Sequence, residues 1–205
     1  MKTLEWQNFF AEQRALHGKV VFSVAELANA AQTTLHALNT ELGRLVRRGI
    51  IQRYAQGRYG PSQGVDPEAI LAAVDPGAYI TGFYALFRCH LVTQVPTEIT
   101  CFTHRRHNRK SDRITPAGKL RFICVPASVY SKPADQVIAP AEQALCDFAW
   151  LNLRDGLDPQ SLVTFQSLDT LGRRRLNKAL RRYPEEVWST VGRITGFATG
   201  TNSHQ

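Results

Sequence analysis

The sequence predicts an α+β protein, with an N-terminal winged helix-turn-helix followed by a mixed α/β C-terminal domain. Two observations favour this class. Residues 1–62 carry helix-spaced apolar patterns and then a hairpin pattern, and residues 66–195 mix helical patterns with two strand-like runs. A chain of 205 residues is long enough for two domains. We expect residues 196–205, rich in Gly, Thr and Ser, to be a disordered tail.

The first helix is predicted from apolar residues at helical spacing, and it ends at Gly18. These residues share one face: Trp6, Phe9, Phe10 and Leu16. The apolar run 20–22 suits a brief strand. Ser23 and Glu26 then form a capping-box pattern, in which each side chain binds a free backbone N–H of the other residue. A short helix over 24–30 should follow and bury Val24, Leu27 and Ala28.

A second helix is predicted over about 34–48, with Thr33 as its cap. Its apolar side holds Leu35, Leu38, Leu42, Leu45 and Val46. Its opposite side holds Thr33, Ala37, Thr40, Arg44 and Arg47, flanked by His36 and Arg48. Gly43 costs about 1 kcal/mol relative to Ala inside a helix, and a tight helix crossing would explain it. Gly49 ends the helix with a left-handed cap.

A β-hairpin is predicted next, from the apolar and aromatic runs 50–54 and 58–60 around the turn 55–57. Arg53 and Arg58 lie near its tip. Two helices joined by a turn, followed by a basic hairpin, are typical of a winged helix-turn-helix. Such a unit can instead serve protein contact alone, and the net charge of +8 favours DNA over that alternative.

The polar side of the second helix is therefore the predicted DNA-binding site. A slim helix with small polar and arginine side chains fits the major groove. The residues expected in the groove are Thr33, Thr34, His36, Ala37, Thr40 and Arg44. Those expected at phosphates or in the minor groove are Arg47, Arg48, Arg53 and Arg58.

The C-terminal part should contain further helices and two strands. The predicted strands cover 99–103 and 120–125, with an alternating pattern in the first. The predicted helices cover about 67–74, 79–87, 140–151, 159–165 and 187–191. Another predicted helix begins after its cap, Asp169, and continues to about residue 183. The apolar face of the helix over 140–151 is Ala144, Leu145, Phe148 and Leu151.

Charge alternates along the chain, with net values of +4, −3, +6, −4 and +5 for residues 1–60, 61–103, 104–121, 122–170 and 171–205. The later basic blocks form a possible secondary basic surface: Arg105, Arg106, Arg109 and Lys110 in the loop 104–113, and Arg173, Arg174, Lys178, Arg181 and Arg182 on a helix. Each set can bind phosphate or an acidic partner, or can be a solvated surface.

Motifs for catalysis and cofactor binding are missing. The sequence has no GxxxxGK[ST], GxGxxG or GxSxG pattern, so we expect no cofactor and no enzymatic activity. Cys89, Cys101, Cys124 and Cys146 form no CxxC pair and are expected to be buried thiols. A zinc site could be formed by Cys101, His104, His107 and Cys124, but their spacing matches no common zinc finger. A metal-dependent nuclease site could be formed by Asp75, Glu98 and Asp112, but no nuclease motif supports it.

Membrane and export signals are also missing. No stretch approaches the roughly 18 apolar residues of a membrane span, and Glu5 and Gln7 fall where a signal peptide needs apolar residues. We therefore expect a cytoplasmic protein without a membrane partner.

Three segments beyond the predicted winged helix resemble the AbiEi-like antitoxins of type IV toxin–antitoxin systems. They are Thr81-Gly82-Phe83-Tyr84-Ala85-Leu86, Gln94-Val95-Pro96, and Pro140-Ala141-Glu142-Gln143-Ala144-Leu145-Cys146-Asp147. The family pattern is a Ser/Thr-Gly-x-x-Ala-Leu helix, a Gln-Val-Pro strand entry and a Pro-x-Glu-x-Ala-Leu-x-Asp helix. The similarity extends to about Arg182.

The resemblance implies a repressor that binds its own operator through the N-terminal winged helix and autoregulates its operon. It also implies a C-terminal domain that counters a nucleotidyltransferase-like toxin, with no direct complex required. Two alternatives stay open. The chain can be a stand-alone winged-helix regulator, or a nuclease-like enzyme with a DNA-binding front end.

Overall fold

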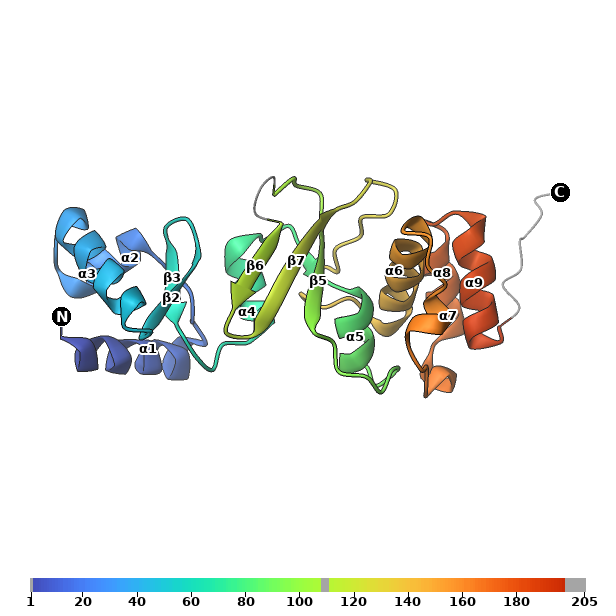
Figure 1. Ribbon diagram of the computed structural model, residues 1–205, viewed down its shortest axis with the longest axis horizontal. Helices are drawn as coiled ribbons and strands as arrows, with labels where there is room; N and C mark the ends of the chain where they lie inside the picture. The colour runs from blue at the N-terminus through green and yellow to red at the C-terminus, as the bar shows by residue number, and fades with distance from the viewer. Residues whose placement is uncertain (1, 108–110, 198–205) are drawn as a thin grey trace. The chain divides into compact units, whose positions relative to one another are not determined.

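The computed structural model describes residues 2–107 and 111–197. The described chain contains α-helices and two β-sheets, which confirms the predicted α+β class (Figure 1). The chain divides into two compact units. Unit 1 holds residues 1–76 and 112–120, and unit 2 holds residues 77–111 and 121–205. Within the described ranges every helix is too short or too polar to cross a bilayer.

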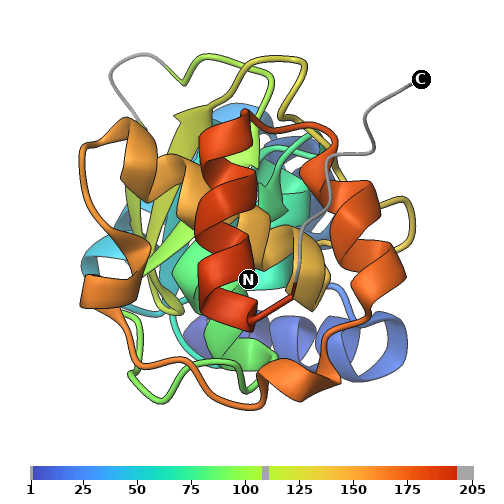
Figure 2. The same cartoon turned by 90° about the vertical axis from the view of Figure 1, so that its right-hand side faces the viewer.

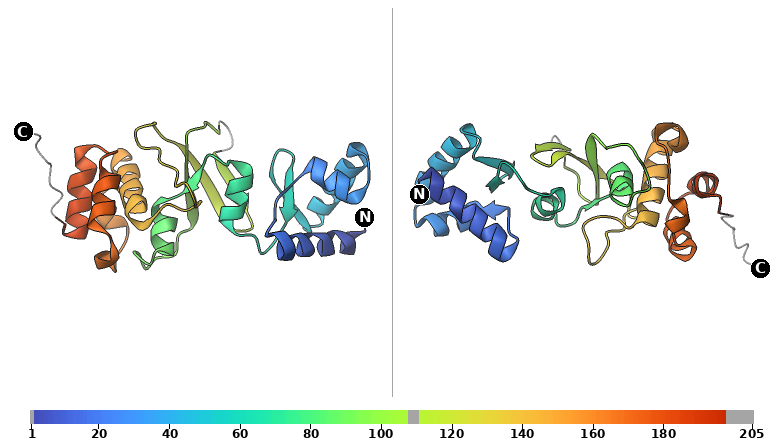
Figure 3. Two further views of the ribbon diagram at one scale, coloured as in Figure 1. Left: turned by 180° about the vertical axis from the view of Figure 1, so that it is seen from behind. Right: turned by 90° about the horizontal axis from the view of Figure 1, so that it is seen from below.

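Unit 1 begins with three helices and a three-stranded sheet. The elements are α1 (Thr3–His17), β1 (Phe22–Ser23), α2 (Val24–Ala31), α3 (Leu35–Arg47), β2 (Ile51–Ala55) and β3 (Arg58–Pro61), followed by α4 (Pro67–Val74) and β6 (Asp112–Thr115). The sheet order is β1-β3-β2, and both pairings are antiparallel. Figure 3 shows the same helices from behind and from below.

The helix ends of unit 1 follow the local chemistry that the sequence predicts. Gly18 ends α1 in the left-handed conformation, with φ +61°. The capping box of α2 forms: Glu26 N–H donates to Ser23 Oγ at 3.2 Å, and Ser23 N–H donates to Glu26 Oε2 at 2.8 Å. The cap of α3 was predicted one residue too early, because Thr34 and not Thr33 accepts the N–H of Ala37.

The core of unit 1 differs from the prediction at the ends of its helices. Trp6, Phe10 and the three central leucines of α3 are buried as expected, but Leu16 is 66% exposed and Leu35 is 56% exposed. Val24 is only half-buried, and Val46 is exposed. Each of these residues lies in a terminal turn of its helix, where fewer neighbouring elements are available to cover it.

The hairpin of unit 1 contains a glycine that packing requires. β2 and β3 pair from Ile51↔Pro61 to Ala55↔Arg58, with an irregular step between Arg53 and Ala55. Gly60 has no room for a side chain, since a Cβ there would lie 2.2 Å from the Val20 carbonyl oxygen. The segment before β1 can therefore approach β3 only because residue 60 is glycine.

Unit 2 combines most of the second sheet with a group of helices. Its elements are β4 (Tyr79–Ile80), α5 (Gly82–Arg88), β5 (Glu98–Thr103), α6 (Ala141–Arg154), α7 (Pro159–Leu162), the 3₁₀ turn η2 (Leu168–Thr170), α8 (Arg173–Leu180) and α9 (Glu185–Thr195). β7 (Gly118–Cys124) begins in unit 1 and ends in unit 2, and the sheet order is β4-β5-β7-β6. α6 packs against α5, α8 and α9, and Figure 2 shows this helical side with α9 in front.

Three predicted elements of the C-terminal part were wrong in their extent or type. The predicted helix 79–87 starts only at Gly82, because Tyr79 and Ile80 pair with Phe102 and Cys101 of β5. The helix expected from Asp169 starts at Arg173, with Gly172 as its N-cap. The short helix expected over 159–165 ends at Leu162, since the backbone of Val163 is extended.

The strand β6 and the predicted tail also differ from expectation. β6 lies partly in the segment 104–113, which was expected to be a loop. The strand begins with the charged pair Asp112 and Arg113, which gave no strand signal in the sequence. Within the predicted tail, Gly196 caps α9 with φ +68° and Phe197 packs against the core of unit 2. Residues 198–205 lie outside the described residues.

Candidate nucleic-acid interface

The side of α3 that faces away from the core is polar and exposed. We call it the polar face of α3; its members are His36, Ala37, Asn39, Thr40, Gly43, Arg44 and Arg47, all exposed. The opposite side buries Leu38, Leu42 and Leu45 completely or nearly so. Because the apolar side is anchored in the core of unit 1, the polar face is held outward in a fixed orientation.

The start of α3 presents the predicted threonines in different ways. Thr34 is exposed, but its hydroxyl already accepts the Ala37 N–H as the helix cap. Thr33 is half-buried, and Gln32 before it adopts a left-handed conformation with φ +48°. This sharp turn separates α2 from α3, so both helices can pack on one core.

The arginines at the end of α3 are exposed and only weakly engaged. Arg44 Nη2 lies 3.4 Å from Glu41 Oε1, and Arg47 Nε donates to the Gly43 carbonyl at 3.3 Å. Arg48, the C-cap residue, is exposed as well. Exposed contacts of this kind contribute little to stability, so these cations can exchange them for a bound anion.

The tip of the β2–β3 hairpin carries the other two predicted arginines. Arg53 donates to the Ala55 carbonyl at 3.3 Å, and its guanidinium lies 5.9 Å from the centroid of the Tyr59 ring. Arg58 is exposed and has no polar partner in the described chain. Gly57 provides the left-handed turn with φ +67°. Unit 1 thus exposes every residue predicted for DNA except the half-buried Thr33.

Sequence reasoning missed two members of the polar face of α3. Asn39, which the sequence pattern did not assign to either side of the helix, is exposed beside His36 and Thr40. The structure does not support a tight helix crossing as the explanation for Gly43, because a Cβ there would meet nothing within 4 Å. His36, Thr40, Gly43 and Arg47 follow one line along the helix at helical spacing.

The hairpin β2–β3 is also braced by a segment distant in sequence. Gln52 Nε2 donates to the Ile114 carbonyl at 2.8 Å, and Arg113 Nη1 donates to the Tyr54 carbonyl at 3.2 Å. These bonds join β2 to β6 inside unit 1. Partial burial lowers the pKa of Arg113, and the nearby Asp75 opposes this change. No local sequence pattern pointed to this contact.

Most of the basic residues that were predicted on the later helix are exposed. Arg173, Arg174, Lys178 and Arg181 are exposed around α8, and Arg182 is half-buried. We call the first four residues the basic face of α8. The side chains of Arg174, Lys178 and Arg181 have no ion pair or hydrogen bond within the described residues.

A buried glutamate holds the start of α8. Glu142 of α6 is 3% exposed, and its Oε1 accepts the Gly172 N–H and the Arg175 Nε, both at 2.8 Å. A carboxylate at this position satisfies a free N–H of the helix and complements its dipole. Glu142 therefore replaces the cap that was predicted at Asp169 and fixes how α8 presents its basic face.

The structure describes only part of the predicted basic loop. Arg105 and Arg106 are exposed, whereas Arg109 and Lys110 lie outside the described residues. The flanking histidines pack on aromatic rings: His104 lies 5.2 Å from Tyr130 and His107 lies 4.2 Å from Phe122, measured between ring centroids.

The structure does not assemble the metal sites considered from the sequence. Among the described residues, no three His, Cys, Asp or Glu side chains are placed to share a metal ion. In the nuclease set, Glu98 pairs with Arg121 at 3.0 Å and Asp112 pairs with Lys119 at 2.8 Å. The four cysteines are free thiols. Cys124 is exposed rather than buried, because it ends β7, and Cys89 is half-buried.

A buried carboxylate lies in the core of unit 2. Asp147 of α6 accepts from Thr81 Oγ1 and from the Tyr183 hydroxyl, both at 2.6 Å. Burial raises the pKa of Asp147 to about 7, against the opposing effect of these hydrogen bonds. Thr81 and Asp147 belong to two of the segments quoted above for the family resemblance, and here both lie in the core. Their arrangement stabilises the packing of α6 and offers no surface to a ligand.

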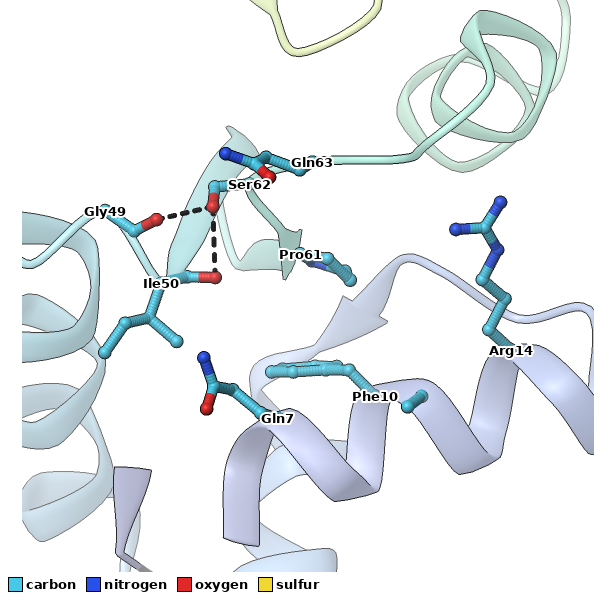
Figure 4. Close-up of a pocket in the computed structure, with 9 residues that line it drawn as sticks. Gln7, Phe10, Arg14, Gly49, Ile50, Pro61, Ser62 and Gln63 are labelled. Carbon is cyan, nitrogen blue, oxygen red and sulfur yellow. Dashed lines mark hydrogen bonds between the residues drawn. The ribbon is translucent and has the colours of Figure 1, made fainter. Parts of the chain in front are cut away.

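Each unit contains a cavity lined by described residues. One, of about 380 Å³, lies in unit 1 between α1, the turn after α3 and the end of β3 (Figure 4). Phe10, Ile50 and Pro61 line it, and the Ser62 hydroxyl there already donates to the Gly49 carbonyl. The other, of about 250 Å³, lies in unit 2 between α5, β5 and α6. Neither is lined by a described buried polar side-chain atom that lacks a partner, so neither indicates a ligand.

Comparison with known proteins identifies a fold relative and no family. No family model and no curated protein matches the chain. Among solved structures, the chain is similar to the crystal structure of the RV2827C protein from Mycobacterium tuberculosis, with 15% sequence identity and a TM-score of 0.57. The match covers 94% of this chain and 76% of that chain. At this identity the likeness shows a shared fold.

Proposed function

We propose that this protein is a sequence-specific DNA-binding repressor and that residues 1–62 act as a winged helix-turn-helix. In this proposal α3 enters the major groove, and the β2–β3 hairpin contacts the neighbouring backbone or minor groove. The observation that carries it is the polar face of α3. A helix with one side anchored in the core and the other side small, polar and cationic is suited to a groove lined with base edges and phosphates.

The proposed contacts divide by chemistry. Arg44 lies in the last turn of α3 with about half of its side chain exposed, and it would donate two hydrogen bonds to the O6 and N7 of a guanine. Thr33, Thr34, His36, Ala37 and Thr40 would contact base edges beside it. Arg47, Arg48, Arg53 and Arg58 would bind phosphates or the minor groove, where they contribute affinity with little sequence selectivity.

The test is a binding titration of the purified full chain against duplex DNA from the region upstream of its own gene. Arg44→Ala should weaken binding to the operator by about 1–3 kcal/mol and leave binding to random duplex nearly unchanged. Arg58→Ala should weaken binding to both duplexes and lower the slope of log affinity against log salt by about one.

The matched control is Arg14→Ala, which removes the same charge from an exposed position on α1. It should bind the operator like the wild type at the same salt concentration. Normal operator affinity and salt response in both the Arg44 and Arg58 variants would contradict the proposal.

We further propose that the repressor is the non-enzymatic antitoxin of a type IV system and acts in the cytoplasm. This part rests on the resemblance of the segments near Thr81, Gln94 and Glu142 to the AbiEi-like antitoxins. A neighbouring gene for a nucleotidyltransferase-like toxin is expected. Co-expression should restore growth of cells that express this toxin, without a stable complex between the two proteins. If growth arrest persists when the two proteins are expressed at matched levels, the antitoxin role is wrong and the protein is a stand-alone regulator.

A second role is favoured by the basic face of α8, which Glu142 holds in place and on which the side chains of Arg174, Lys178 and Arg181 have no acidic partner within the described residues. It offers a site for an acidic surface or for phosphates, separate from the polar face of α3. The triple change Arg174→Glu, Lys178→Glu and Arg181→Glu should keep operator binding and lose toxin neutralisation. If the variant retains both activities, the basic face of α8 is only a solvated surface and binds no partner.

A further inference from the structure

Glu41 connects the first helix of unit 1 to the proposed base-reading arginine. Its Oε1 accepts the indole N–H of Trp6 at 2.9 Å and lies 3.4 Å from Arg44 Nη2. The three residues come from α1 and from two positions of α3 that are one turn apart. One oxygen atom therefore contacts both a buried donor and an exposed cation.

The Trp6 end of this connection is rigid. The Trp6 side chain is completely buried, and its ring is stacked on Phe10 at 5.8 Å and contacts Phe9 edge-on at 5.9 Å. An indole nitrogen only donates, and a buried donor without a partner loses its hydrogen bonds to water without compensation. Trp6 therefore fixes the Glu41 carboxylate, whose side chain is only 17% exposed.

The Arg44 end is open to solvent, with 48% of its side chain exposed. An exposed ion pair contributes little to folding stability. The effect of this ion pair is to orient the Arg44 guanidinium. Arginine has a long flexible side chain that loses rotamer freedom on binding, and a side chain already held in place loses less.

We infer that Trp6 and Glu41 are positioning residues that tune the sequence selectivity of α3 by favouring one orientation of the exposed Arg44 side chain. This inference rests on the proposed DNA-binding function. A guanidinium that favours this orientation reaches a guanine edge more readily than a phosphate, and the nearby carboxylate disfavours phosphate further. The pair thus raises the ratio of specific to non-specific affinity rather than affinity as a whole.

Variants of Glu41 and Trp6 should therefore lower operator affinity without lowering the affinity for random duplex. Glu41→Gln keeps an oxygen that accepts from Trp6, so the fold is retained, but it removes the charge that attracts Arg44. Operator affinity should fall about three- to tenfold, while affinity for random duplex should stay equal or rise. Trp6→Phe keeps an aromatic ring and removes the donor, and it should reduce discrimination in the same direction. A merely structural role would lower both affinities together.

The experiment measures operator and random-duplex affinities at one salt concentration for the full chain, with thermal melts to verify folding. Glu12→Gln is the matched control, since it removes one negative charge from an exposed position on α1. It should keep the wild-type ratio. In an Arg44→Ala background, Glu41→Gln should have no further effect on discrimination.

The outcomes separate the two proposals. If the wild type does not prefer its operator over random duplex, the proposed function fails and the positioning role fails with it. If the wild type is selective and Arg44→Ala loses selectivity, but Glu41→Gln keeps the wild-type ratio, only the positioning role is overturned. An equal effect of Glu41→Gln with and without Arg44 would overturn it as well.

Discussion

Gly43 is the residue at which stability and binding should respond in opposite directions. It lies inside α3, on the exposed polar face, and a Cβ at this position meets no atom within 4 Å. Glycine in a helix interior costs about 1 kcal/mol relative to alanine. Nothing in the fold of unit 1 explains why this cost is accepted, whereas close approach of a DNA backbone would explain it.

Gly43→Ala should therefore raise the free energy of unfolding by about 1 kcal/mol, because the added methyl group is accommodated and the unfolded chain loses freedom. The same methyl group projects from the line of His36, Thr40 and Arg47, so it should weaken binding to operator DNA. Denaturant titration measures the first effect, and anisotropy with a labelled operator duplex measures the second.

The control for Gly43→Ala is a glycine whose conformation is required. Gly18→Ala introduces a side chain at φ +61°, and it should lower stability by about 1 kcal/mol. A Gly43→Ala protein that is less stable than the wild type would refute the structural reasoning. A protein that is more stable and binds the operator with unchanged affinity would refute the proposed approach of DNA to this face.

Three further predictions concern the folding of each unit. Gly60→Ala places a Cβ 2.2 Å from the Val20 carbonyl oxygen, so it should destabilise unit 1 by about 2–4 kcal/mol in a denaturant titration. Asp147→Asn should flatten the pH dependence of the free energy of unfolding. Folding raises the pKa of Asp147 from 3.8 to about 7, so the wild type loses stability as the pH rises between these values. Thermal melts of both proteins at pH 5 and pH 8 measure this difference. Glu142→Ala leaves the Gly172 N–H without its acceptor and should cost about 1–3 kcal/mol, measured by thermal unfolding.

The parts of the fold that the sequence predicted well depend on short-range chemistry. The capping box of Ser23 and Glu26, the helix end at Gly18 and the turn at Gly57 each involve residues a few positions apart. The spacing of leucines along α3 likewise identified its buried side, and with it most of the candidate site. These features need no information about the rest of the chain.

The parts that failed depend on partners far along the chain. Tyr79 and Ile80 have helical spacing with Phe83, but pairing with β5 about twenty residues later makes them a strand. A short apolar run does not distinguish the two structures by its period. β6 was hidden for a similar reason, since three of its four side chains are polar and its strand conformation depends on pairing with β7 at the edge of the sheet.

Two buried acids of unit 2 explain why the basic face of α8 stays available. Glu142 caps α8, and Asp147 binds Thr81 and Tyr183 in the core. Both carboxylates satisfy donors inside unit 2, so neither is presented at the surface beside the exposed side chains of Arg174, Lys178 and Arg181. The side chains that stabilise this core therefore leave α8 with a cationic surface, and binding of phosphates or of an acidic partner through it should weaken steeply with salt.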